Sequence, residues 1–130
     1  QLFKRMVFNE YAKNYDDHTK NIGFLMDKRG HWKVAPAFDV TYAYNPNGRW
    51  TGTHQMTFNG KRENFTLEDF KTVAKNAGLV QGRYKRILEQ VQDSLATFKK
   101  RAKVNDVPKN LIQEVEKNLL KFFFFFKSHF

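Results

Sequence analysis

Three polar side chains near the start of the chain are spaced so that they could hold a magnesium ion and orient a hydroxyl group. Asp16 and Asn21 stand five residues apart, and Asp39 follows eighteen residues after Asn21. Carboxylate and amide oxygens suit Mg²⁺, which is a hard cation, and a positioned carboxylate can accept the proton of a hydroxyl. Together these groups would support phosphoryl transfer, which needs an oriented hydroxyl and cations against the developing negative charge.

The spacing resembles the active-site motifs of protein kinases. In kinases a catalytic Asp precedes a metal-binding Asn in a D-x-x-x-x-N loop, and a second metal-binding Asp follows in a D-F-G segment. Asp16 and Asn21 reproduce the first spacing, which favours Asp16 over Asp17 because Asp17 lies only four residues before Asn21. Asp39 supplies the third group, within the tetrapeptide Ala-Phe-Asp-Val.

Neighbouring segments narrow this match to one family. Residues 14–21 read NYDDHTKN, residues 35–41 read APAFDVT, and residues 55–61 contain Gln-Met followed by Asn-Gly-Lys. With the tripeptides at residues 7–9 and 25–27, these segments resemble the carboxy-terminal lobe of HipA-type serine/threonine kinases, the toxins of bacterial toxin–antitoxin systems. The family's catalytic loop commonly reads D-x-H-x-K-N and its metal segment P-x-Y/F-D-V/I. Asp17 is a departure, since many relatives carry a small residue there.

The resemblance implies roles for five residues. Asp16 would orient the Ser or Thr hydroxyl of a protein substrate, and Asn21 and Asp39 would hold Mg²⁺. Lys20 and His18 would lie on the side of the ATP cofactor, where Lys20 either neutralises phosphate or stays solvated and His18 orders the loop. The implied reaction transfers the γ-phosphate of ATP to a protein hydroxyl. The implied partners are ATP, a protein substrate such as a translation component, and an antitoxin.

The nucleotide-covering part of a kinase has no counterpart in this sequence. There is no Gly-rich phosphate loop and no strand lysine of the V-A-I-K type, which relatives carry in the preceding part of a longer chain. Three alternatives stay open. The sequence, which begins at Gln1, is an excerpt of a longer kinase, or one component of a split kinase completed by a separate amino-terminal chain, or a catalytically incompetent remnant.

The elements around these motifs predict one domain over residues 1–130, α+β and mostly α-helical. Apolar residues at helical spacing between Phe3 and Tyr11 predict a helix over residues 1–13, which leads into the catalytic loop, 14–21. Two short apolar runs flank an Asp-Lys-Arg-Gly turn, which predicts a β-hairpin in the metal-binding segment, 22–40. The two ends of this hairpin should hold Asn21 and Asp39 close together. This is the small hairpin at the active site of a kinase-like carboxy-terminal lobe.

The second half of the chain predicts a helical part over residues 66–127, after an irregular stretch at 41–65. Thr66 and Asp69 form a capping-box signature, and the helix that they open should end near Gly78. An apolar stripe predicts one longer helix over residues 82–102. The last helix should begin around Pro108. Its buried face is expected to consist of Leu111, Ile112, Val115 and Leu119.

Five consecutive phenylalanines, Phe122 to Phe126, would cover every side of a helix, so some should be exposed unless another element buries them. Three interpretations stay open: a terminal helix packed into the core, a contact for a missing lobe or partner chain, or a carboxy terminus altered by a frameshift. A membrane anchor is disfavoured because the run is short and Lys127 follows it.

A net charge of +10 favours polyanionic partners, so a basic nucleic-acid-binding module is the rival function. Cations at residues 61–62, 83–86 and 99–101 could contact phosphates, with Trp32, Trp50 or Tyr44 stacking on bases. No helix-turn-helix or other nucleic-acid signature supports it, so nucleic acid is expected to bind weakly or indirectly. The histidines at 31, 54 and 129 lack zinc-like spacing and receive no role.

The composition is that of a globular protein, with 41% hydrophobic and 28% charged residues. The absence of cysteine excludes disulfides and a thiol nucleophile, and it suits a reducing cytosol, so a cytoplasmic location is expected. No stretch reaches the roughly eighteen apolar residues that span a bilayer, and the start does not resemble a signal peptide. No membrane partner is therefore expected.

Overall fold

The computed structural model describes the backbone of residues 1–127 and the side chains as far as Leu119. Within this part of the chain, helices dominate and the sheet is a single two-stranded hairpin, so the predicted mostly helical α+β class is confirmed. The elements are α1 (Leu2–Tyr11), a 3₁₀ turn η1 (Thr19–Asn21), β1 (Phe24–Met26), β2 (Trp32–Val34), α2 (Leu67–Asn76), α3 (Arg83–Ala96), α4 (Phe98–Val104) and α5 (Lys109–Lys127).

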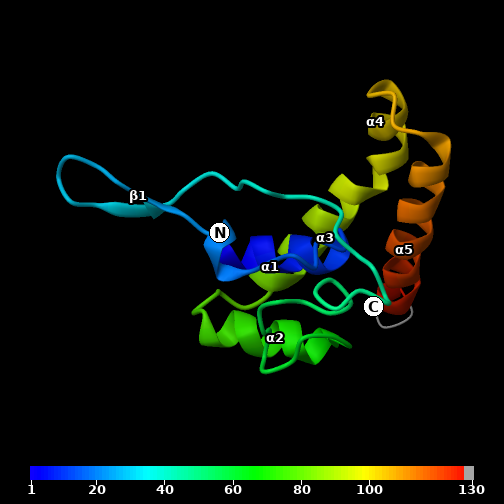
Figure 1. The fold of residues 1–130 in the computed structure, drawn as a ribbon. Helices are drawn as coiled ribbons and strands as arrows, with labels where there is room; N and C mark the ends of the chain where they lie inside the picture. The colour runs from blue at the N-terminus through cyan, green and yellow to red at the C-terminus, as the bar shows by residue number, and fades with distance from the viewer. Residues whose placement is uncertain (128–130) are drawn as a thin grey trace.

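The core forms where α1 lies against α3, with α2 beside them (Figure 1). The predicted helical spacing is confirmed, because Phe3, Val7 and Tyr11 occupy one face of α1 and are all buried. Phe70 of α2 is fully buried and packs its ring 4.9 Å from that of Phe58. Burial of aromatic and branched side chains at this junction is the main force that holds the three helices together.

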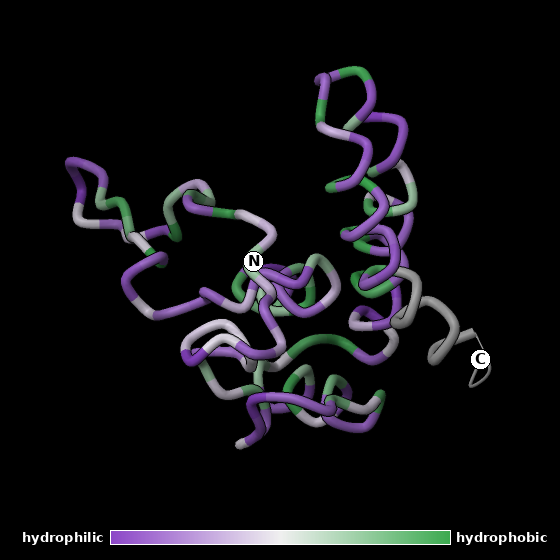
Figure 2. The backbone as a smooth tube through the Cα atoms, turned by 45° about the vertical axis from the view of Figure 1, so that its right-hand side comes forward, coloured by the Kyte–Doolittle hydropathy of each residue, from purple (hydrophilic) through white to green (hydrophobic). Residues whose placement is uncertain are grey.

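The hairpin is confirmed, with strands shorter than the apolar runs. Its strands pair antiparallel, with Phe24 opposite Val34 and Met26 opposite Trp32. The carboxylate of Asp27 accepts hydrogen bonds from the backbone N–H groups of residues 29 and 31, which fixes the tight turn. The hairpin projects away from the helices (Figure 1), and Figure 2 shows that this projecting part contains hydrophobic residues. Trp32 is 67% exposed.

The capping box at the start of α2 is confirmed. Thr66 Oγ1 accepts a hydrogen bond from the backbone N–H of Asp69, and the Asp69 carboxylate accepts one from the backbone N–H of Thr66 at 2.8 Å. Asn59 and Lys61 also donate to the Asp69 carboxylate, at 2.7 and 2.8 Å. Asp69 therefore ties the irregular segment to the start of α2 as well as capping it. The helix ends at Asn76, close to the predicted end near Gly78.

The prediction of one helix over residues 82–102 is wrong, because the chain turns at Thr97 and divides the stretch into α3 and α4. The Thr97 hydroxyl donates to the Ser94 carbonyl at 2.7 Å, and the Thr97 N–H bonds the same carbonyl. A side-chain hydroxyl that bonds a nearby carbonyl competes with the regular helical ladder, and a contact three residues back tightens the turn. The apolar residues keep their helical spacing across Thr97, so the sequence pattern gave no sign that the helix is interrupted there.

The last helix begins one residue after Pro108, near its predicted start, and packs beside α4 (Figure 1). Ile112, Val115 and Leu119 are buried as predicted, but Leu111 is 39% exposed and that part of the prediction is wrong. Leu111 is adjacent to Ile112, and neighbouring positions on a helix point about 100° apart, so the narrow buried face takes only one of them. The structure does not describe the side chains of Phe122 to Phe126, so the three interpretations of this run fall outside the described residues.

The middle of α5 is tied to the start of the irregular stretch. Asn118 donates a hydrogen bond to the Tyr42 hydroxyl at 2.6 Å. The same hydroxyl donates to Glu114 Oε1 at 3.5 Å. In the described part of the chain no helix is both long and apolar enough to cross a bilayer.

Candidate active site

Two backbone contacts bring the loop at residues 14–21 and the segment around Asp39 together. At the hairpin base, the Ala35 N–H donates to the Gly23 carbonyl at 2.9 Å. Beyond Asp39, the Ala43 N–H donates to the Lys13 carbonyl at 3.0 Å, and the Ala43 carbonyl accepts from the Tyr15 N–H at 3.2 Å. The segment that carries Asp39 is therefore held at Ala35 before it and at Ala43 after it. Asn21 and Asp39 reach the same cavity.

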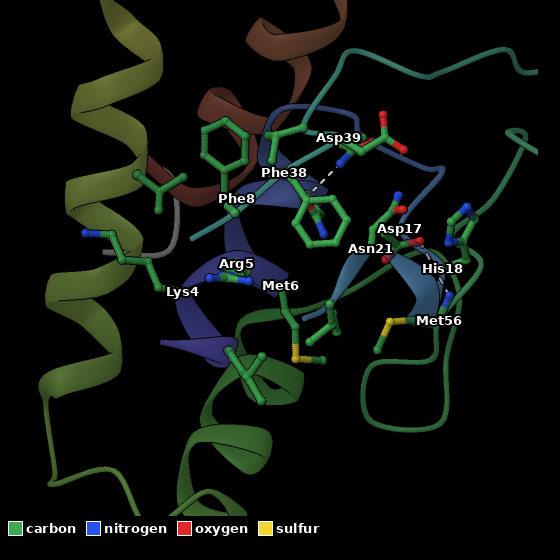
Figure 3. Close-up of a pocket in the computed structure, with 17 residues that line it drawn as sticks. Lys4, Arg5, Met6, Phe8, Asp17, His18, Asn21, Phe38, Asp39 and Met56 are labelled. Carbon is green, nitrogen blue, oxygen red and sulfur yellow. Dashed lines mark hydrogen bonds between the residues drawn. The ribbon is translucent and has the colours of Figure 1, made fainter. Parts of the chain in front are cut away.

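That cavity has a volume of about 440 Å³. Asp17, His18, Asn21 and Asp39 lie on one side of it, as Figure 3 shows. The α1 helix supplies the opposite side, where the polar residues Lys4, Arg5 and Asn9 also line the cavity. The other residues that line the cavity are mainly apolar and include Leu2, Met6, Phe8, Ile22, Phe38, Val40 and Met56.

Asn21 is oriented by its own loop. Its side-chain Nδ2 donates to the main-chain carbonyl of Asp16 at 3.1 Å, and its backbone N–H bonds the His18 carbonyl at 3.0 Å. Since the amide nitrogen is used inside the loop, the amide oxygen is the atom that Asn21 can present to a ligand. The contact also makes the positions of Asp16 and Asn21 interdependent.

Asp39 has an unusual backbone conformation. Its φ of 51° lies in the left-handed region, which costs energy for a residue other than glycine and which Asp and Asn tolerate best. Its side chain is exposed to the cavity and to solvent. A strained carboxylate residue at a cavity is the kind of observation from which a functional site is inferred.

The five predicted site residues do not all reach the cavity. His18, Asn21 and Asp39 line it, whereas Asp16 and Lys20 do not. The Asp16 side chain is 47% exposed, and its Oδ1 lies 3.9 Å from His18 Nε2. Asp16 is thus accessible from solvent on the same loop, and Lys20 is exposed.

The donor set can be compared with what Mg²⁺ requires. Within the described residues, no group of three or more His, Cys, Asp or Glu side chains is placed to hold a metal ion. Mg²⁺, however, is commonly bound through one or two protein oxygen ligands, with waters and substrate phosphates completing its shell. One carboxylate from Asp39 and one amide oxygen from Asn21 fit this mode of binding.

Sequence reasoning missed His54, which anchors the loop from behind. Its Nδ1 lies 2.9 Å from Asp17 Oδ2, and its Nε2 lies 2.6 Å from Glu10 Oε2. All three residues are largely buried, with the His54 side chain only 3% exposed. Asp17 Oδ1 accepts further hydrogen bonds from the backbone N–H groups of Gln55 and Met56, at 2.8 and 3.4 Å.

The charge state of His54 follows from these contacts. Burial disfavours the charged imidazolium, but the hydrogen bonds to Asp17 and Glu10 and their negative charges outweigh it, so the pKa of His54 is raised. Lys13 adds a second cation, 3.3 Å from Glu10 Oε1. Burial beside Glu10 also raises the pKa of Tyr15, whose ring lies 4.1 Å from that of His54. The only sign of this contact in the sequence was the unusual acidic residue at position 17, since a buried carboxylate needs a hydrogen-bond donor such as His54.

The comparison with protein families agrees with this geometry. The model of the HipA-like C-terminal domain matches residues 1–98, which contain α1, the loop, the hairpin, Asp39, α2 and α3. α5 and nearly all of α4 lie outside the matched region. No curated protein matches the chain. Since the match covers most of the sequence and includes the predicted motifs, the chain belongs to the family of proteins with a HipA-like C-terminal domain.

Proposed function

We propose that this chain is the catalytic carboxy-terminal lobe of a HipA-like protein kinase, which transfers the γ-phosphate of ATP to a Ser or Thr hydroxyl. The observation that carries the proposal is that Asn21 and Asp39 line one cavity beside the loop that bears Asp16. Membership in the HipA-like family supports the same assignment and, with it, the role of a toxin paired with an antitoxin.

Asn21 and Asp39 would hold Mg²⁺ through the amide oxygen and the carboxylate. Bound there, the ion would balance negative charge on the nucleotide phosphates. The bond from Asn21 to the Asp16 carbonyl keeps the amide oxygen turned out of the loop. Asp16 would receive the substrate hydroxyl, and its half-exposed side chain is accessible to a residue of another protein.

The remaining residues that line the cavity suit the other parts of a nucleotide. Arg5 donates to the Ala35 carbonyl through one guanidinium nitrogen, while its Nη1 is buried and has no hydrogen-bond partner among the described residues. A buried cationic donor without a partner is costly, and a phosphate oxygen would satisfy it. The apolar side chains of Phe8, Phe38 and Ile22 offer a surface for a planar base.

ATP would be held only partly by these residues, because the sequence contains neither a Gly-rich loop nor a strand lysine. We therefore expect weak nucleotide binding by this chain and efficient transfer only together with an amino-terminal kinase portion, supplied in the same polypeptide or a separate one. A chain that binds no nucleotide would instead fit the alternative of a catalytically incompetent fragment.

Calorimetric titration with Mg²⁺-ATP tests the proposal directly. The wild-type chain should show saturable heat that requires Mg²⁺, and Asp39→Asn should lose it because the carboxylate ligand is removed. Asp93→Asn is the matched control, since Asp93 is exposed on α3 and does not line the cavity. Equal binding by Asp39→Asn and wild type would contradict the assignment of the metal site.

A basic nucleic-acid-binding surface is the second candidate, favoured by the charge of α4. Four of the seven residues of this helix are Lys or Arg, it has no acidic residue, and all four cations are exposed. Trp32 and Trp50 are exposed too, but they lie in the hairpin and the irregular segment rather than on α4. Binding to nucleic acid that falls steeply with salt and is unaffected by Asp39→Asn would favour this function.

A further inference from the structure

A buried bridge joins three parts of the chain that are distant in sequence. Glu10 is near the end of α1, Asp17 is in the loop, and His54 is in the irregular segment; the ring of His54 contacts both carboxylates, at 2.6 and 2.9 Å. We propose that this Glu10–His54–Asp17 bridge sets the position of the catalytic loop, with His54 as a positioning residue. The inference rests on the phosphoryl transfer proposed above and assigns a part of the same site.

The bridge fixes the loop because Asp17 uses both carboxylate oxygens in it. One oxygen meets His54, and the other accepts the backbone N–H groups of Gln55 and Met56. The Asp17 side chain is only 10% exposed, so it is an internal anchor rather than a second proton acceptor beside Asp16. Two adjacent aspartates in the loop are thereby given different tasks, one directed inward and one open to solvent.

The anchored residue is the chain neighbour of Asp16, the residue that would receive the substrate hydroxyl. Asp16 precedes Asp17 in the chain, so the backbone position of Asp17 sets that of Asp16. The Asp16 carbonyl in turn accepts the hydrogen bond that orients Asn21. A displacement of about 1 Å at a reacting group can reduce a rate by roughly a hundredfold, so an anchor of this kind matters for transfer although it touches no substrate.

Only the doubly protonated ring of His54 can donate to Glu10 and Asp17 at once. A neutral ring would turn a lone pair toward one of two buried carboxylates, which is unfavourable. Among the described residues, the other charged or titratable groups at the bridge are Tyr11 at the end of α1, Lys13 and Tyr15 at the start of the loop, and Arg62 in the irregular segment; Tyr44 and Glu63 interact electrostatically with Tyr15. Lys13 and Arg62 are the cations among them; Arg62 donates to the His54 carbonyl.

The hairpin contains a natural control for this bridge. His31 Nδ1 lies 3.1 Å from Asp27 Oδ2, the same type of pair at a similar distance, but the side chains are 75% and 53% exposed. Among the described residues, no hydrogen bond links this pair to the loop at residues 14–21. If a histidine–aspartate pair were enough to produce the effect, replacing His31 would act like replacing His54. If His54 positions the loop, only the replacement of His54 should affect it.

The bridge can be tested without any enzymatic assay. Nitrogen chemical shifts of labelled histidine in the intact chain should show both ring nitrogens of His54 protonated at neutral pH. Amide hydrogen exchange should then compare wild type, His54→Gln and His31→Gln. We expect His54→Gln to speed exchange at residues 14–21 by about tenfold or more while amides of α1 and α3 keep their protection. His31→Gln should leave the loop unchanged.

The outcomes separate this inference from the proposed function. A neutral His54 at pH 7, or unchanged loop exchange in His54→Gln, overturns the inference whatever the protein binds. Faster exchange throughout the core overturns it too, because His54 would then be a general packing residue. Loosening of the loop alone, with Mg²⁺-ATP binding weakened in parallel, supports it. Loosening of the loop in a chain whose wild type binds no nucleotide supports the bridge and counts against phosphoryl transfer.

Should His54→Gln fail to fold, Asp17→Asn replaces it in the same comparison. This change keeps the size of the side chain and its acceptor oxygen but removes the charge that faces His54. It should lower the pKa of His54 and increase loop exchange, and Asp93→Asn on α3 is its control. An unchanged His54 titration in folded Asp17→Asn would overturn the bridge.

Discussion

The loop at residues 14–21 and the hairpin at residues 24–34 each contain an aspartate paired with a histidine, His54 of the irregular segment in the first case and His31 of the hairpin itself in the second, yet the two pairs have opposite surroundings. His54 is buried between two carboxylates behind the loop, and His31 is exposed at the end of a projecting hairpin. In the first case water cannot replace a lost partner, and in the second case it can. The comparison shows that burial, more than the identity of the pair, decides how much each contact matters.

The same contrast applies to hydrophobic residues. Phe70 and Val7 are fully buried at the junction of the helices, whereas Phe24, Met26 and Trp32 of the hairpin are more than half exposed. The helical junction thus contributes most of the stability, and the hairpin mainly determines where its two ends lie. Function depends on both, because the cavity forms where the end of the hairpin meets the loop.

The largest expected effect separates catalysis from stability. In the complete kinase assembly, Asp16→Asn or Asp39→Asn should reduce phosphoryl transfer by about a thousandfold, since a proton acceptor or a metal ligand is lost. The free energy of unfolding should change by less than about 0.5 kcal/mol, because both side chains are substantially exposed. Radiolabelled phosphate transfer and chemical denaturation measure the two quantities. Full activity in both variants would refute the site.

The second effect tests the division between the helical junction and the hairpin. Phe70→Ala should cost about 3–5 kcal/mol of unfolding free energy, because it opens a cavity among packed aromatic rings. Trp32→Ala should cost less than about 0.5 kcal/mol, since its ring is mostly in water. Urea denaturation followed by circular dichroism compares them. Similar costs for the two variants would mean that the hairpin is buried in solution.

A third effect sharpens the histidine comparison through pH. Because the pKa of His54 is raised in the folded state, its stabilisation is complete below 6.5, the ordinary pKa of histidine, and is lost as the pH rises through the raised value. His54→Gln should therefore be less stable than wild type by about 3 kcal/mol near pH 6, with a smaller difference toward pH 9. His31→Gln should match wild type throughout. A difference independent of pH would argue against a charged His54.

The smallest effect concerns Asp69, whose carboxylate is buried at the capping box. Burial alone would raise its pKa, but hydrogen bonds from Lys61, Asn59 and Thr66 outweigh it and lower the pKa below its usual 3.8. The stabilisation is then present above pH 3.8 and lost as the pH falls through the lower value. Asp69→Asn should cost about 1 kcal/mol near neutral pH and less in acid. Glu68→Gln, on the exposed side of the same helical turn, is the control.

The sequence predicted what depends on short spacings. The helical face formed by Phe3, Val7 and Tyr11 repeats within one element, and the capping box needs only Thr66 and Asp69. The loop motif from Asp16 to Asn21 is also local, and its contact through the Asp16 carbonyl closes within six residues. In each case the interacting groups are near one another before the chain folds.

The features that the sequence did not predict depend on long-range contacts, or on a side-chain hydrogen bond that competes with the helical backbone bonds and leaves the apolar pattern unchanged. His54 pairs with Asp17 across 37 positions and with Glu10 across 44, which no spacing rule covers. The break at Thr97 arises from a hydroxyl that bonds the Ser94 carbonyl, while the apolar stripe runs on unchanged. The exposure of the hairpin likewise depends on which other elements pack against it. The apolar residues of its strands do not show whether any element does.

The left-handed backbone at Asp39 also limits which sequences can occupy this site. A β-branched or bulky residue is disfavoured at a φ of 51°, so most replacements there should lower stability, by about 1–2 kcal/mol, as well as changing the chemistry. Glycine and asparagine tolerate the conformation, and of the two only asparagine keeps a side chain of similar shape. In a mutational scan, position 39 should therefore meet two successive requirements, one of backbone geometry and one of charge; Gly and Asn should both satisfy the first and fail the second, and only Asn should do so with a side chain of similar shape.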